Sequence, residues 1–438
     1  MTKQPAWIRT LDLFLLRIFF RKISVVGIER VPTEGPVIFV ANHVNSIIDP
    51  MILAGLLPRT IRFLAKAPLF RQPIMGRILR AARALPVYRR MDPGSDMSRN
   101  EETFKACVHA LQDGDAMALF PEGISHDEPQ LQRLKTGAAR IAGRAMSLGA
   151  AVQIVPVGLV YEDKTAFRST VTAVVGPPIP TEGIVFREGE EEGPVRELTA
   201  RVDEGLHHVT INADTFEDIE LMEGLWEMAR ESLGLEAEPG ARVRALRGFL
   251  ERYYRARKDH PTLLHALAVR ARAYRRALRS AGVTDRDVRM KRSTGPALRF
   301  TLKRLAFILG TYPPAFLGGV FHFVPYTLTG PVAKLMTRRP DTLGLNKLAV
   351  GVLFFPLFYF LQGWALFQVG GPWLCVPALI LAPFAGFWAL RYYEVREDFL
   401  ATAWAFLLLL TRRGLGRRLR EMRRDVLDAL EPLSGLYR

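Results

Sequence analysis

The sequence predicts an α/β fold, in which a mixed-sheet domain is followed by a helical region and a C-terminal membrane helical hairpin. Two observations support this prediction. From Lys22 to about Pro180, short β-rich runs alternate with helical stretches. From Leu348 to Leu390 the chain contains no Asp, Glu, Lys or Arg. We therefore expect an amphipathic helix over residues 1–21, the α/β domain over 22–212, the helical region over 213–300 and the membrane-embedded region over 301–438.

Composition limits the class of protein. The chain has 438 residues, 49% of them hydrophobic and 24% charged, so it can bury one or two large cores and is not wholly embedded in lipid. A net charge of +16 predicts attraction to phosphate on a nucleic acid, an anionic lipid surface or a small substrate. Cys107 and Cys375 lie far apart, which indicates a reducing, cytoplasm-facing location with no disulfide framework and no metal motif.

The N-terminal stretch is apolar but does not match the pattern of a signal peptide. Asp12 and Arg17 interrupt the apolar run, and no small-residue cleavage site follows. On a helix one face carries Trp7, Leu11, Phe14, Leu15 and Ile18. That face lies either on a membrane or on a protein core.

The α/β pattern comes from five strand-like stretches separated by Gly, Pro and charged residues. They read "ISVVG", "VIFVA", "AMALF", "VQIVPVGLVY" and "TVTAVV". After Pro180 the strand signals fade, and Arg-rich amphipathic stretches such as "RVRALRGFLERYYRARKD" predict helices with a solvated charged face.

The charge-free stretch splits at "VGGPW" into two segments of about 20 residues, each long enough to cross a hydrocarbon core of roughly 30 Å. Basic residues flank the pair, which places both ends in the cytoplasm: Arg338, Arg339, Lys347, Arg391 and Arg396. The alternative is a pair of buried core helices. A second uncharged stretch, residues 305–333, contains four prolines that we expect to break any single helix, so we interpret it as re-entrant or interfacial.

The stretch "VIFVANHVNSIIDPMIL" places His43 and Asp49 between two apolar runs. They are either a catalytic base with its orienting acid, or a satisfied histidine and a helix N-cap followed by Pro50. A six-residue step does not bring two side chains together on a regular helix, so the first interpretation requires an irregular turn. "FPEGISHDEPQLQRLKTG" is a second polar turn after a strand. Cations near strand ends suit an anionic ligand, and the candidates are Lys66, Arg89, Arg90 and Lys135.

Four stretches in order, "NHVNSIIDP", "ALPVYR", "FPEGISHD" and "IVPVGLVY", resemble the four blocks of the glycerolipid acyltransferase superfamily, which includes the glycerol-3-phosphate and lysophosphatidate acyltransferases. The resemblance implies that His43 is the general base and that Asp49 holds its imidazole. It also implies that the acceptor phosphate binds Arg89 and the turn at Glu122 and Gly123, and that the "IVPV" block helps to form the acyl side. Three further substrate-binding candidates are Lys66, Ser125 and Lys135. Ser125 lacks the G-x-S-x-G pattern of a nucleophile.

One feature departs from the family pattern: five residues separate His43 from Asp49 where four are usual. The longer spacing looks most like the branch that acts on glycerol 3-phosphate or dihydroxyacetone phosphate, in which a membrane-embedded C-terminal region is expected. The resemblance therefore implies a multi-pass membrane O-acyltransferase, with its catalytic domain facing the cytoplasm. It would move a fatty acyl group from acyl-CoA or acyl-carrier protein to glycerol 3-phosphate in phosphatidic acid synthesis, with no cofactor and no metal.

Three alternatives remain beside that interpretation. The acceptor is lysophosphatidate in the first, and the protein is a non-catalytic membrane lipid-binding protein in the second. The third, a nucleic-acid binder, rests on charge alone, because the basic residues are spread along the chain and no binding module is recognised. The donor, the chain length and the oligomeric state stay open.

Overall fold

The computed structural model describes residues 6–88, 97–187, 192–229, 240–289 and 294–435. The chain divides into two compact units. The first comprises Met1–Thr215, Ala237–Arg247 and Thr337–Leu348, and the second comprises Phe216–Glu236, Gly248–Met336 and Ala349–Arg438.

A seven-stranded sheet forms the centre of the first unit. Its order is β1-β7-β6-β2-β5-β3-β4, and neighbouring strands are parallel except for the antiparallel pair β6 and β7. The predicted mixed sheet is therefore confirmed. The strands are β1 (Phe20–Val26), β2 (Val37–Ala41), β3 (Ile61–Lys66), β4 (Leu85–Val87), β5 (Ala116–Leu119), β6 (Gln153–Tyr161) and β7 (Ser169–Val175).

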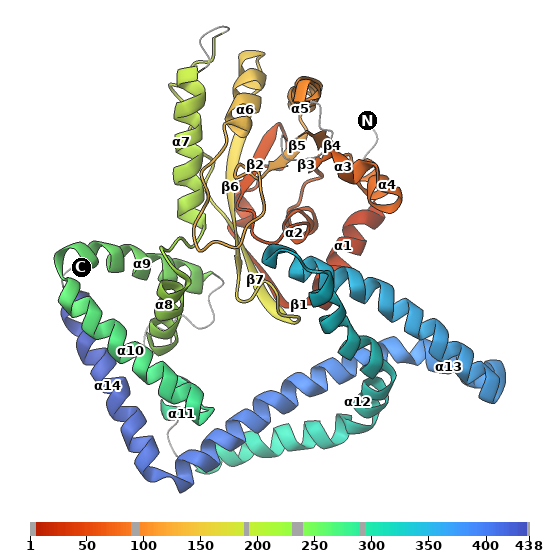
Figure 1. Cartoon of the computed structure of the whole chain (residues 1–438), viewed down its shortest axis with the longest axis vertical. Helices are drawn as coiled ribbons and strands as arrows, with labels where there is room; N and C mark the ends of the chain where they lie inside the picture. The colour runs from red at the N-terminus through yellow and green to blue at the C-terminus, as the bar shows by residue number, and fades with distance from the viewer. Residues whose placement is uncertain (1–5, 89–96, 188–191, 230–239, 290–293, 436–438) are drawn as a thin grey trace. The chain divides into compact units, whose positions relative to one another are not determined.

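Helices cover both faces of this sheet (Figure 1). On β2, Ile38 and Val40 face one hydrophobic core while Phe39 and Ala41 face the other, as expected for a strand buried on both sides. The core of Phe39 includes residues of α1 (Ala6–Phe19) and α2 (Ile48–Leu56). The core of Ile38 includes residues of α5 (Asn100–Gln112), α6 (Gly137–Ser147) and α7 (Glu192–Val209). Two shorter helices, α3 (Ala67–Phe70) and α4 (Pro73–Ala81), follow β3.

The strand order decides where a site can form. β2 lies between β5 and β6, and all three run parallel, so their carboxyl ends meet at one edge of the sheet. The polar turns that follow β2 and β5 therefore lie side by side. In open α/β sheets this edge is where ligands bind.

The five predicted strands are confirmed as β1, β2, β5, β6 and β7. β3 and β4 were not predicted, because they carry few buried residues and lie toward one margin of the sheet. On α1, Ile8, Leu16 and Phe19 are buried. On the predicted apolar face Trp7, Leu11 and Phe14 are exposed, and Leu15 and Ile18 are half-buried, so most of that face lies outside the core.

Five helices form part of the second unit: the acidic α8 (Phe216–Ala229) and the arginine-containing helices α9 (Ala241–Asp259, most of it), α10 (Pro261–Ala281), α11 (Asp285–Arg289) and α14 (Arg413–Gly435). The helix predicted from "RVRALRGFLERYYRARKD" is confirmed as α9. Asp285 joins three of these helices, because its buried carboxylate accepts hydrogen bonds from Tyr274 Oη at 2.7 Å and from Arg289 and Arg423 Nε at 2.9 Å.

The expectation that prolines interrupt residues 305–333 is wrong. α12 runs as one helix, Thr294–Met336, with Pro313, Pro314, Pro325 and Pro331 inside it. Proline in a helix leaves one backbone carbonyl without its donor, and a neighbouring helix can supply a replacement. The carbonyl four residues before Pro325, that of Phe321, accepts a hydrogen bond from Gln362 Nε2 at 2.8 Å.

α13 (Leu343–Thr411) contains the predicted hairpin. Gly370 and Gly371 have non-helical backbone angles, and Gly371 has a φ of 59° that favours glycine. A Cβ on Gly363 would lie 2.9 Å from the side chain of Leu379, so the arms on either side of the break pack together. By length and composition, two described helices can cross a membrane, and the most apolar windows are only 11% and 17% buried. The alternative of buried core helices is not supported.

Candidate active site at the strand ends

The turn after β2 brings His43 and Asp49 together. Ser46 has a φ of 44°, which gives the turn the irregular shape that this contact needs. His43 Nδ1 lies 2.8 Å from Asp49 Oδ2. α2 begins at Ile48 with Ile47 as its N-cap, so Asp49 belongs to the first helical turn and the interpretation as an N-cap is wrong.

The Asp49 carboxylate is fully buried and accepts every hydrogen bond it makes. Oδ2 accepts from the backbone N–H groups of Val44 at 2.9 Å and Asn45 at 2.7 Å. Oδ1 accepts from the hydroxyl of Tyr161. Burial, together with the charge of Asp49, raises the pKa of Tyr161 well above its usual value, so this phenol stays a donor. A carboxylate surrounded by donors fixes the tautomer in which His43 Nδ1 carries the proton and donates it.

The His43 ring remains open on its other side. It stacks on Phe120 with ring centroids 4.2 Å apart, and its side chain is 19% exposed. Among the residues that the structure describes, no hydrogen-bond partner is seen for Nε2. In the tautomer that donates from Nδ1, the ring presents Nε2 as a nitrogen held in orientation that can accept a proton.

The turn after β5 supports the first turn through Glu122, which is 2% exposed. Glu122 Oε1 accepts from the backbone N–H of His43 at 2.7 Å. Oε2 accepts from Gln132 N at 2.8 Å and from His126 Nε2. The backbone N–H of His126 donates to the His43 carbonyl at 3.1 Å, so the two turns form one hydrogen-bonded body.

Gly123, Ser125 and Lys135 lie in or beside the same two turns. Gly123 has a φ of +72°, and a Cβ there would lie 2.6 Å from Lys135 Nζ, so the lysine side chain passes close to the backbone at a position whose φ favours glycine. Ser125 Oγ accepts from the backbone N–H of Ser46 at 3.0 Å.

Lys66 and Arg89 complete the set of predicted binding residues. Lys66 is the exposed last residue of β3, two strands from β2, at the carboxyl edge of the sheet. Arg89 and its neighbour Arg90 lie outside the described residues. The "IVPV" stretch lies inside β6, where Ile154, Val155 and Val157 are buried in the cores on the two faces.

Sequence reasoning missed Tyr161 and Lys164. Lys164 Nζ donates to the carbonyls of Val44 at 2.9 Å and His126 at 3.2 Å, and pairs with Asp127 Oδ1 at 2.7 Å. It thereby joins the two turns a second time. One signal was present in the sequence: both residues lie at or just beyond the end of "VQIVPVGLVY", and a strand parallel to β2 must end at the same edge.

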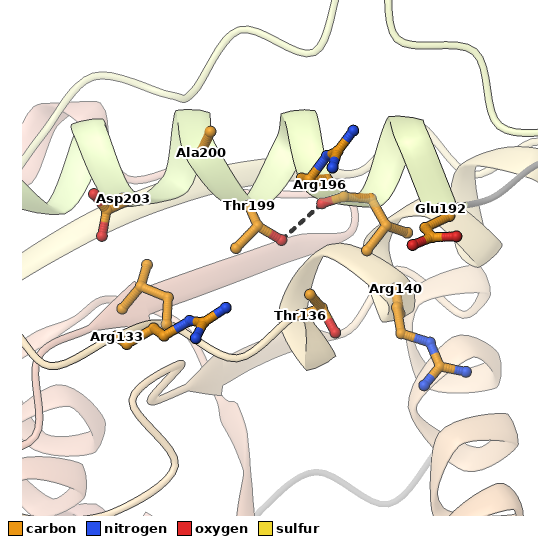
Figure 2. A pocket seen from close by; sticks show the side chains of 10 residues that line it. Arg133, Thr136, Arg140, Glu192, Arg196, Thr199, Ala200 and Asp203 are labelled. Carbon is orange, nitrogen blue, oxygen red and sulfur yellow. Dashed lines mark hydrogen bonds between the residues drawn. The ribbon is translucent and has the colours of Figure 1, made fainter.

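A separate cleft of about 740 Å³ lies between α7 and the segment that leads into α6 (Figure 2). Arg133, Arg140 and Arg196 line it together with Glu192 and Asp203, so its charges nearly balance. Neither His43 nor Asp49 lines this cleft. The candidate site therefore consists of the strand-end turns and does not include the cleft.

Among the described residues, neither Cys107 nor a metal-binding cluster adds a second site. Cys107 is buried in α5, and burial raises the pKa of its thiol to about 12. The described residues contain no group of three or more His, Cys, Asp or Glu side chains placed to hold a metal ion.

Comparison with known proteins supports the predicted resemblance. Residues 22–160 match a family model described as Acyltransferase. Glycerol-3-phosphate O-acyltransferase 2 of Saccharomyces cerevisiae is 29% identical over 295 residues, covering 65% of this chain and 37% of that protein. The chloroplastic 1-acyl-sn-glycerol-3-phosphate acyltransferase LPAT1 of Arabidopsis thaliana is 30% identical over 146 residues, covering 33% and 38%. The 1-acyl-sn-glycerol-3-phosphate acyltransferase of Bacillus subtilis is 31% identical over 136 residues, covering 30% and 62%.

The chain thus spans less than two-fifths of the length of the first two relatives, at 37% and 38%. The resemblance to glycerolipid acyltransferases predicted from the four sequence blocks is confirmed over the matched residues 22–160.

Proposed function

We propose that the chain, whose residues 22–160 match the Acyltransferase family model, is a membrane-bound O-acyltransferase acting on glycerol 3-phosphate. The donor in this proposal is acyl-CoA or acyl-carrier protein. The observation that carries it is the His43 ring, whose Nδ1 is held by buried Asp49 while Nε2 faces no described partner. A protein that only binds lipid has no need of a base oriented in this way.

The reaction follows from that geometry. Nε2 of His43 takes the proton of the acceptor hydroxyl while the hydroxyl oxygen attacks the thioester carbonyl of the donor. The C–S bond then breaks, and the leaving thiolate takes the proton from the imidazolium. Asp49 stabilises the imidazolium throughout. A positioned base of this kind contributes about 10² to 10⁴ in rate.

Glu122 and Ser125 act as positioning residues in this proposal. Both Glu122 oxygens are engaged within the protein, one of them by the backbone of His43, so the carboxylate fixes the catalytic turn. Ser125 fixes the same turn through Ser46. Binding of the acceptor phosphate falls to the cations Lys66, Arg89 and Lys135, because a small dianion is held mainly by charge-assisted hydrogen bonds.

Glycerol 3-phosphate is the preferred acceptor because the similarity to a glycerol-3-phosphate acyltransferase extends over more of the chain than the similarity to a lysophosphatidate acyltransferase. The match to the yeast glycerol-3-phosphate acyltransferase spans 295 residues of alignment, whereas the match to the Arabidopsis enzyme spans 146. The five-residue spacing between His43 and Asp49 supports the same branch. Lysophosphatidate is the second candidate, since the Arabidopsis and Bacillus relatives are named 1-acyl-sn-glycerol-3-phosphate acyltransferases.

The membrane part of the proposal rests on the hairpin in α13, with both of its ends and the acyltransferase domain on the cytoplasmic side. A single crossing by α12 would separate Arg338 from the chain that precedes α12, so in this proposal α12 is re-entrant or interfacial. A cysteine at Val369, close to the Gly370–Gly371 break, tests this topology in a chain whose Cys375 is changed to serine. We expect an impermeant maleimide added outside intact cells to label it. Labelling of a cysteine at Arg338 from outside, with Val369 protected, would contradict the topology.

Purified protein in phospholipid vesicles, offered labelled acyl-CoA or acyl-carrier protein with a panel of acceptors, tests the function. The expected product from glycerol 3-phosphate is lysophosphatidate. Acylation of lysophosphatidate alone would assign the second step of phosphatidate synthesis instead. Transfer to no acceptor from either donor would refute the enzymatic proposal.

A further inference from the structure

The segment Thr337–Leu348 links α12 to α13, yet it belongs to the first unit, whereas most of α12 and α13 belong to the second. It contains the short 3-10 helix η3 (Pro340–Thr342) and the first turns of α13. We call this segment the strap. It lies far outside residues 22–160, which match the acyltransferase family.

The strap contacts the candidate site through Arg339. The guanidinium is held by the buried carboxylate of Asp341, with Nε at 3.1 Å from Oδ1 and Nη2 at 3.2 Å from Oδ2. From this fixed position Nη2 donates to the backbone carbonyl of Ser125. Ser125 is the residue whose hydroxyl accepts from Ser46 in the catalytic turn.

Gly344 gives the second contact. A Cβ there would lie 2.8 Å from the Lys164 carbonyl, 3.0 Å from Asn45 Oδ1 and 3.2 Å from Ile48 Cδ1. The backbone of α13 therefore packs directly on both the catalytic turn and the loop after β6. The Asn45 backbone N–H is one of the donors that hold Asp49.

Two more contacts fix the end of the strap. Lys347 Nζ donates to the backbone carbonyl of Thr165 at 2.6 Å, and Thr165 directly follows Lys164 in the loop after β6. Leu348 packs against the hydrophobic core that contains Phe39 and Ile48. The strap thus touches the turn after β2, which carries His43, the turn after β5, which carries Glu122, and the loop after β6, which carries Lys164.

We propose that the strap is part of the catalytic site, and that Arg339 and Gly344 are positioning residues for the His43–Asp49 pair. Three loops supply the hydrogen bonds around this pair, and the strap bonds to or packs on each of them. The site is then incomplete without a segment that the chain supplies between its two apolar helices. The part of this inference that concerns turnover rests on the proposed acyltransferase function.

Matched substitutions in the full-length protein test the proposal. Gly344→Ala forces a methyl group against Lys164 and Asn45, whereas Gly351→Ala in the same helix meets nothing within 4 Å. Arg339→Ala removes the contact to Ser125, whereas Arg338→Ala removes the same charge from the neighbouring exposed position. We expect Gly344→Ala and Arg339→Ala to lower kcat by about tenfold or more, with the KM of donor and acceptor within about twofold of wild type. The two control variants should keep wild-type turnover.

Hydrogen–deuterium exchange on the same proteins separates positioning from general destabilisation. In Gly344→Ala and Arg339→Ala, peptides covering residues 42–47 and 122–127 should exchange faster, while β2 and β5 remain as protected as in wild type. Unchanged exchange in both turns, or equal loosening of the strands, would overturn the proposal. Exchange does not depend on the acceptor. If the wild-type protein transfers no acyl group, the proposed function fails, while the exchange result still decides whether the strap holds the turns.

Discussion

The two strand-end turns each contain a histidine bonded to a buried carboxylate. The two histidines differ in whether their second ring nitrogen has a described hydrogen-bond partner. In the turn after β2, His43 bonds Asp49 through Nδ1, is 19% exposed and shows no described partner at Nε2. In the turn after β5, His126 is 8% exposed and uses both nitrogens, because Nε2 bonds Glu122 and Nδ1 accepts from Glu128 N at 3.2 Å.

A histidine–carboxylate pair is therefore not by itself evidence of a base. A proton acceptor needs a free lone pair that a substrate can reach. By that test the proposed mechanism uses His43 as the base, and His126 supports the turn that holds it. Both histidines follow an apolar run in the sequence, His126 in "EGISHD" and His43 in "ANHVN", so the sequence alone does not distinguish their roles.

The largest effect is expected for His43→Ala. Removal of the base should lower turnover by about 10² to 10⁴, while folding and membrane attachment persist because the ring lies at a partly exposed turn. Steady-state transfer by the purified variant, with circular dichroism and vesicle flotation as controls, measures this. Near-normal turnover would remove His43 from the mechanism.

Asp49→Asn should have the next largest effect. The amide keeps the volume of the side chain but no longer stabilises the imidazolium, and its NH₂ group competes with the donors of Val44 and Asn45. We expect turnover to fall by about tenfold to a hundredfold, less than for His43→Ala. A loss larger than that of His43→Ala would mean that Asp49 acts mainly on folding, which thermal unfolding of both variants would reveal.

His126→Gln is expected to change turnover by less than about threefold. Glutamine can donate to Glu122 in place of Nε2, although Glu128 N loses its acceptor, so stability should fall by about 1 kcal/mol. Kinetics and thermal unfolding in the same detergent check both expectations. Loss of activity as complete as in His43→Ala would break the distinction between the two pairs.

The smallest effect concerns Asp12 on α1, far along the chain from both turns. Burial raises the pKa of its carboxyl from 3.8 to about 6. The folded chain then binds this proton more tightly than the unfolded chain, so stability is highest at low pH and falls as the pH rises through about 6. Asp12→Asn should remove that loss and stabilise the fold by about 1 kcal/mol near pH 8, once solvent screening is allowed for. Near pH 4 the two proteins should unfold alike, and an equal gain at both pH values would contradict this cause.

The fold was predictable where pattern alone decides structure. Five strands follow from alternating apolar runs, and the hairpin follows from a charge-free stretch split by Gly370 and Gly371. Prolines misled the prediction for α12, because a helix can tolerate a proline when another donor satisfies the carbonyl left without a partner, as at Pro325. Gln362, far along the chain, supplies one, and no local pattern predicts that pairing.

The candidate site was predictable in its residue types but not in its geometry. His43, Asp49, Glu122, Gly123 and Lys135 all come from two strand-end turns. Their contacts depend on the left-handed backbone at Ser46 and on the order of strands in the sheet. The supporting residues come from distant segments that only folding brings together, namely Tyr161, Lys164, Arg339 and Gly344.

One measurement tests the central claim, that His43 offers the reactive nitrogen, more directly than any substitution. The wild-type protein is treated with diethyl pyrocarbonate, and mass spectrometry follows the modification of each histidine beside residual acyl transfer. We expect loss of activity to follow modification of His43 in proportion, glycerol 3-phosphate to slow it, and hydroxylamine to reverse it, while His126 reacts slowly. Full activity after complete modification of His43, or inactivation that follows another histidine, would contradict the account.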